Sequence, residues 1–163
     1  MTASSDTFAK SWRGITPLHS TAQDVRKLFP ACEEKETGCS LAFEDQEVVI
    51  IYSGPDILGG PAECKGIPKG TVLAIIVRFH GLKKLEEFKL KRERFTTFDP
   101  SDPPKRIYKA YFYAREGLII NTYEGQAFQL AYIAAEKDIP LCPEYYDDPK
   151  GFVAIGAGHD RLP

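Results

Sequence analysis

TVLAIIVRF, the stretch from Thr71 to Phe79, is an almost continuous apolar run. Strands that are buried on both faces have this pattern, whereas a half-buried strand alternates between apolar and polar residues. We therefore expect a central strand here, covered on both of its faces.

Five further runs of β-branched or aromatic residues predict the other strands. Leu41–Phe43 and Glu47–Ser53 are separated by three polar residues, which is the arrangement of a hairpin. The remaining runs are separated by short glycine-bearing turns, so they predict an antiparallel meander over 106–114, 117–124 and 127–135.

Two segments predict short helices. Ser20 and Gln23 have the spacing of a capping box at the start of a helix over Thr21–Phe29. The second helix is expected at 82–90, where apolar residues recur on one helical face. Helices of this length are marginal on their own, so each has to pack on the sheet.

The pattern predicts an α+β fold: an antiparallel sheet of about six strands with two short helices packed on one face. A helix followed by three strands occurs twice, so a tandem α-β-β-β repeat is an alternative to a single unit. The chain of 163 residues suits one domain. We expect this domain at 12–143, with an N-terminal tail at 1–11 and a C-terminal tail at 144–163.

Composition argues against nucleic-acid binding and against a membrane-spanning segment. The formal net charge is −2 and the charges are interspersed, whereas a nucleic-acid-binding protein usually has a basic excess or stripe. No apolar run approaches the roughly 18 residues of a membrane span. We therefore expect no nucleic acid and no membrane span, and the sequence leaves the oligomeric state open.

Four cysteines predict two disulfides, although they allow three pairings and free buried thiols are the alternative. We favour Cys32–Cys39, which ties the end of the first helix to the first strand, and Cys64–Cys142, which pins the irregular loop at 53–70. Disulfides persist in oxidising compartments, so we expect a periplasmic or secreted protein. The polar N-terminus lacks the apolar centre of a signal peptide, so any such peptide is expected to be missing from this sequence.

The stretch Trp12–Pro30, WRGITPLHSTAQDVRKLFP, resembles the opening motif of the SmpA/OmlA-like (BamE-like) outer-membrane lipoproteins, with Phe29-Pro30 in place of the usual Leu-Gly. That fold is similar to the β-lactamase-inhibitor-protein fold, which packs short helices on antiparallel sheet. From Trp12 to Cys142 the chain also resembles a set of uncharacterised secreted bacterial proteins. The shared landmarks are WRGITPLHST, YSGP, IPKGTVLAIIV and Cys142-Pro143. This resemblance implies a secreted protein with disulfides and implies no particular chemistry.

Candidate catalytic groups are few. His19 could pair with the thiol of Cys32, but no third group to orient the imidazole is evident. An acidic tail set could bind a hard cation through oxygen, although such tails are usually solvated: Glu144, Asp147, Asp148, His159 and Asp160. We therefore predict no catalytic residues, no metal site and no cofactor.

Tyrosines are the most suggestive candidates for binding. Tyr111, Tyr113 and Tyr123 are expected to share one sheet face, with Tyr132 less certainly placed, and Trp12 either closes the core or binds a partner. Tyrosine gives large, rigid contact area and is enriched at interfaces. The leading hypothesis is a non-catalytic extracytoplasmic binding or scaffold domain that engages a protein through this aromatic face. The alternative is a hydrolase-like enzyme with its site between the 53–70 loop and the acidic C-terminal tail.

Overall fold

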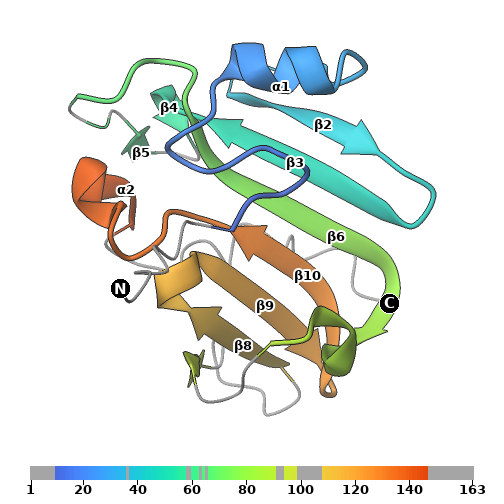
Figure 1. Cartoon of the computed structure of the whole chain (residues 1–163). Coiled ribbons are helices and arrows are strands. Elements are labelled where there is room, and N and C mark those ends of the chain that lie inside the picture. Colours follow the sequence, from blue (N-terminus) through green and yellow to red (C-terminus); the bar gives the residue numbers. More distant parts are fainter. Residues whose placement is uncertain are drawn as a thin grey trace, which may run out of the picture.

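One antiparallel sheet of eight strands forms the body of the protein (Figure 1). The computed structural model describes residues 10–35, 37–57, 60–62, 64, 66–90, 94–98 and 108–146. In spatial order the strands are β1 (Glu33–Lys35), β2 (Gly38–Ala42), β3 (Gln46–Tyr52), β6 (Val72–Lys84), β10 (Gln126–Tyr132), β9 (Leu118–Tyr123), β8 (Tyr108–Tyr113) and β7 (Thr96–Phe98). Every neighbouring pair runs antiparallel.

The central strand is the one that the apolar run predicts. β6 lies between β3 and β10, and its residues from Val72 to Val77 are all buried. Their side chains divide between two hydrophobic clusters, with Ile75 in the first and Ile76 in the second. The alternation of side chains along a strand sends consecutive residues to opposite faces. Both faces of β6 are therefore covered, as predicted.

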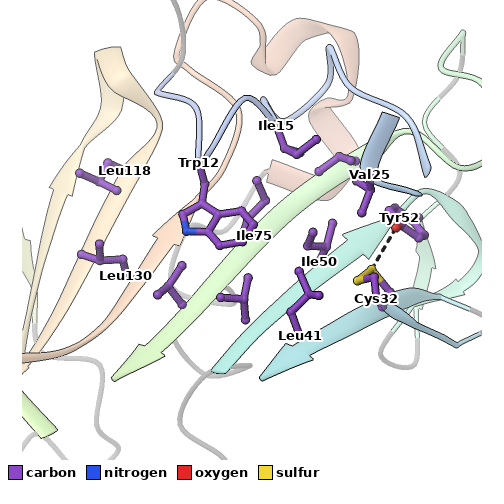
Figure 2. Close-up of a cluster of buried hydrophobic side chains, with 14 of the residues drawn as sticks. Trp12, Ile15, Val25, Cys32, Leu41, Ile50, Tyr52, Ile75, Leu118 and Leu130 are labelled. Atoms are coloured by element: carbon purple, nitrogen blue, oxygen red, sulfur yellow. Dashed lines mark hydrogen bonds between the residues drawn. A yellow bond between two sulfur atoms is a disulfide. The ribbon is translucent and has the colours of Figure 1, made fainter. Parts of the chain in front are cut away.

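The first cluster lies beneath the N-terminal segment and the helix α1 (Ala22–Leu28). Figure 2 shows Trp12, Ile15 and Val25 directed toward the sheet, over Ile50 and Ile75. The second cluster, on the other face, includes both cysteines of the Cys64–Cys142 bridge. The predicted hairpin (β2–β3) and the predicted meander (β8–β9–β10) are both present.

The predicted fold class is wrong in its helices and in its strand number. The segment expected to form a second helix over 82–90 instead continues β6 to Lys84 and then makes the single 3-10 turn η1 (Leu85–Phe88). Lys84 pairs with Gln126 of β10. Hydrogen bonds between these two strands therefore take the place of those that a helix, marginal at this length, would have made. Without that helix the tandem α-β-β-β repeat is also absent. Among the described residues α1 is the only α-helix longer than a single turn.

Helix α1 begins one residue later than predicted. Its N-cap is Thr21, whose hydroxyl accepts the Asp24 N–H while the Asp24 carboxylate accepts the Thr21 N–H. Ser20 is buried instead, and its hydroxyl accepts the Thr16 N–H at 2.9 Å. The capping box is therefore formed by Thr21 and Asp24 rather than by Ser20 and Gln23.

Two regions that were expected to lack regular structure contain short elements. The loop at 53–70 carries a two-stranded sheet, β4 (Gly54–Ile57) with β5 (Gly60–Ala62). Beyond the meander, the 3-10 turn η4 (Ile139–Leu141) leads into the single helical turn α2 (Pro143–Tyr146). Tyr146 is buried, and its hydroxyl donates to the Leu73 carbonyl at 2.6 Å.

Candidate functional site

The sheet register divides the candidate tyrosines between the two faces. Tyr111 and Tyr113 of β8 lie on the face of the first cluster, and Tyr132 packs against that cluster too. Tyr123 of β9 stands directly opposite Tyr108, three residues before Tyr111, so it lies on the other face. The expectation that Tyr111, Tyr113 and Tyr123 share one face is therefore wrong for Tyr123.

A groove of about 140 Å³ opens beside Tyr111 on the first face. We call it the aromatic groove; it is lined by Leu85, Glu86, Lys89, Leu90, Phe95, Tyr111, Tyr113 and Ile120. Phe95 forms one wall, with its ring edge-on to Tyr111 at 4.9 Å and tilted against Tyr113 at 5.3 Å. Phe95 and Tyr111 are both partly exposed, so aromatic surface is accessible from solvent here.

The opposite wall of the groove comes from η1 and the residues after it. The Glu87 carboxylate accepts the Lys84 N–H at 2.9 Å, which fixes the start of this turn. Lys89 ends it with a left-handed backbone, at φ 50°. The turn thus folds back over the sheet and brings Leu85 and Leu90 to the groove.

Cationic side chains flank this end of the sheet. Lys89 and Arg94 are exposed next to the groove, and Lys109 is exposed two residues before Tyr111 on the same strand face. None of these three forms an ion pair with another described residue. Three exposed cations therefore lie at this end of the sheet.

Sequence reasoning missed Phe95, because a charged stretch precedes it and a polar, proline-rich stretch at 96–105, which we expected to be a connection without regular structure, follows it. The available signal was its position directly before Thr96-Thr97, a β-branched pair that favours strand.

Trp12 contributes to the core. Its side chain is buried, with 6% of its surface exposed, and its ring lies 5.1 Å from Phe29 and 6.1 Å from Phe43. The exposed Arg13 guanidinium lies 4.6 Å from the centre of the Phe43 ring. These contacts fit the structural role considered for Trp12, and we leave it out of the candidate site.

Both disulfides join the pairs favoured from the sequence. Cys32 is bonded to Cys39, and Cys64 is bonded to Cys142. Two disulfides are compatible with an oxidising, extracytoplasmic location. Because the Cys39 sulfur carries no hydrogen, the Tyr52 hydroxyl donates to it, at 3.2 Å. Burial, with a smaller contribution from the negative charge of Glu34, raises the pKa of Tyr52 to about 12.

A row of polar side chains crosses the second face of the sheet. Glu47, Arg78, Gln129 and Asn121 stand opposite one another in register on β3, β6, β10 and β9. Glu47 and Arg78 line a second groove, of about 320 Å³, over β1–β3. Gln129 and Asn121 are almost completely buried, and neither amide has a hydrogen-bond partner in the part of the chain that the structure describes.

The catalytic pair considered from the sequence does not form. Cys32 has no thiol to offer His19, because its sulfur is bonded to Cys39. The His19 Nε2 atom lies 3.0 Å from an Asp138 carboxylate oxygen instead. The neighbouring Ser20 hydroxyl accepts the Thr16 N–H.

The cation site considered in the C-terminal tail falls mostly outside the described residues. This applies to Asp147, Asp148, His159 and Asp160, and the side chain of Glu144 is not described either. Within the described part of the chain, no group of three or more His, Cys, Asp or Glu residues could hold a metal ion. No described helix is both long enough and apolar enough to cross a membrane.

Comparisons with protein-family models, curated proteins and solved structures gave no match to this chain. The resemblance of Trp12–Pro30 to the SmpA/OmlA-like lipoproteins therefore stays a prediction.

Proposed function

We propose that the protein is an extracytoplasmic binding or scaffold domain that engages a protein partner through the aromatic groove. The observation that carries this proposal is the partly exposed Phe95–Tyr111 ring pair. Aromatic rings that are held rigidly and left accessible give contact area at a low cost in conformational entropy. The groove is smaller than the roughly 300–1,000 Å³ of a typical small-molecule pocket, which favours a macromolecular partner.

Two further features support this assignment. The groove combines an apolar floor with charged residues at its rim, which is the usual organisation of a protein interface. The disulfides support an extracytoplasmic setting, since such bridges persist in oxidising compartments.

Photo-crosslinking in the cells that produce the protein tests this function. A photoreactive phenylalanine analogue replaces Tyr111 in one variant and Tyr123 in a matched control. Both residues are partly exposed tyrosines on neighbouring strands, but they lie on opposite faces. We expect a discrete adduct with another protein at position 111 and none at 123. Absence of an adduct at 111, or the same adduct at both positions, would contradict the proposed function.

A quantitative test follows once the adduct is identified. With the purified partner, Tyr111→Ala should weaken binding at least tenfold, since interface aromatic anchors commonly contribute about 2 kcal/mol or more. Tyr123→Ala should leave affinity within twofold. Unfolding curves of both variants show whether the fold is retained.

A further inference from the structure

The two edges of the sheet differ in how they are protected against strand addition. The edge strand β1 consists of Glu33, Glu34 and Lys35, all charged and exposed. Glu34 is further held by Arg26 of α1, at 2.6 Å. Charged residues of this kind are a common means of preventing another strand from pairing with an edge.

The opposite edge strand, β7, has no charged residue of its own. Thr96 and Thr97 are exposed, uncharged and β-branched, and β-branched residues favour extended structure. β7 pairs with β8 on one side, and no described strand pairs with its outer side. An edge strand presents backbone N–H and C=O groups along that side, and another extended chain can satisfy them.

The β7 edge lies beside the aromatic groove. Thr97 stands opposite Tyr111, and alternation along the strand puts Phe95 on the same face as Thr97. A strand added outside β7 would run about 4.8 Å from it, with alternate side chains on this face. One such side chain would lie next to Phe95, which directly precedes β7 and forms one wall of the groove, and would pack against its partly exposed ring.

Positively charged side chains near β7 indicate which kind of polypeptide segment would bind there. Lys89 and Arg94 are exposed near the groove and β7, and each lacks an ion pair with any described residue. Together with Lys109 they outnumber the two exposed carboxylates of the turn η1, Glu86 and Glu87. An acidic segment would therefore be attracted to this end of the sheet, whereas a basic one would be repelled.

We infer that the partner binds as an extended, acidic polypeptide segment that pairs with the outer edge of β7 and packs one apolar side chain against the Phe95 wall of the aromatic groove. This mode of recognition is strand addition, in which backbone hydrogen bonds give affinity and side-chain pockets give specificity. The inference rests on the proposed function and names the form of the partner at that same site.

The first test uses peptides selected for binding to the wild-type protein from a phage-displayed library of random dodecapeptides. Selected peptides should alternate apolar and acidic residues. In ¹⁵N-labelled protein they should shift the amide signals of Thr96, Thr97 and Tyr111 more than those of Glu33 and Glu34 on the opposite edge. Failure to select any peptide, or shifts confined to other surfaces, would overturn the inference.

Backbone methylation of a selected peptide then tests strand pairing without altering the protein. A strand uses the N–H groups of alternate residues on one edge only. N-methylation of one alternate set should therefore weaken binding at least tenfold, while methylation of the other set should change it less than threefold. If both methylated peptides bind as the parent does, the strand-addition mode is wrong. A crosslink at Tyr111 would still stand in that case, so the two failures are distinguishable.

A charge-reversal variant gives an independent check. Lys89→Glu combined with Arg94→Glu should weaken binding of the selected acidic peptides at least tenfold. The control with the same change in net charge, Lys35→Glu combined with Lys69→Glu, alters two exposed lysines away from β7 and should change it less than twofold. Equal effects of the two changes would contradict the role given to the charges near β7.

Discussion

Asn121 of β9 and Gln129 of β10 stand directly opposite each other, almost completely buried, and neither side-chain amide forms a hydrogen bond with any described residue. Their neighbours on this face include Ile119 and Ala131 of the second cluster. A buried amide without a partner keeps the cost of losing its hydration, and the low local dielectric makes that cost larger. The pair therefore limits the stability of the sheet at this position.

Replacing both amides by apolar side chains of similar size should stabilise the protein. We expect the double variant Asn121→Leu/Gln129→Met to gain about 1–3 kcal/mol in the free energy of unfolding. Urea denaturation followed by the fluorescence of Trp12, the single tryptophan, measures the change.

Thr122 provides the matched control for the amide pair. It is buried on the same strand, but its hydroxyl donates to the Lys109 carbonyl at 2.8 Å. Thr122→Val should therefore lose about 1 kcal/mol. A loss of stability in the double amide variant as well would show that the two amides have partners in solution.

The two disulfides should differ in their contribution to stability. Cys32–Cys39 closes a loop with a sequence separation of 7, and Cys64–Cys142 one of 78. In the chain-entropy model, these separations correspond to about 2.5 and about 4.5 kcal/mol. We expect the Cys64→Ala/Cys142→Ala variant to lose more stability in urea than the Cys32→Ala/Cys39→Ala variant. The opposite order would show that contacts made by the short bridge outweigh the loop-closure effect.

Sequence patterns predicted the parts of the fold that local rules determine. The run at Thr71–Phe79 is too apolar for any position except the centre of the sheet. The turn at Glu124–Gly125 likewise suits a tight hairpin, because both residues have positive φ. The cysteines were paired from their positions in the expected elements, and both pairs form.

Long-range register could not be predicted in the same way. The spacing of Leu82, Leu85 and Phe88 fits a helix. The chain up to Lys84 is a strand because Lys84 pairs with Gln126, and this long-range pairing cannot be read from the local sequence. The face of Tyr123 depends on its register against Tyr108. Since a shift of one residue moves a side chain to the opposite face, the predicted tyrosine face was correct on β8 and wrong on β9.

Alkaline pH should destabilise the protein through Tyr52. Burial raises the pKa of Tyr52 to about 12 in the folded state, above its ordinary value of 10. The unfolded chain therefore releases this proton first, so the contribution to stability is complete below pH 10 and is lost as pH rises toward 12. Tyr52→Phe should flatten the fall in stability over this window, as measured by urea denaturation at a series of pH values. An unchanged slope would show that Tyr52 ionises with an ordinary pKa in the folded protein.

Gly117 and Gly125 separate the effect of steric overlap from that of backbone conformation. Both have positive φ, 63° and 79°, in the turns on either side of β9. A Cβ atom at Gly117 would overlap the carbonyl oxygens of Ile133 and Ala134, whereas at Gly125 it would meet no atom within 4 Å. We expect Gly125→Ala to cost about 1–2 kcal/mol from the left-handed conformation alone. Gly117→Ala should cost clearly more, because the Ile133 N–H donates to the Gly117 carbonyl at 2.8 Å and holds the two backbones together. Thermal and urea unfolding of the two variants compare these costs, and equal losses would mean that the contact between Gly117 and Ile133 is looser in solution.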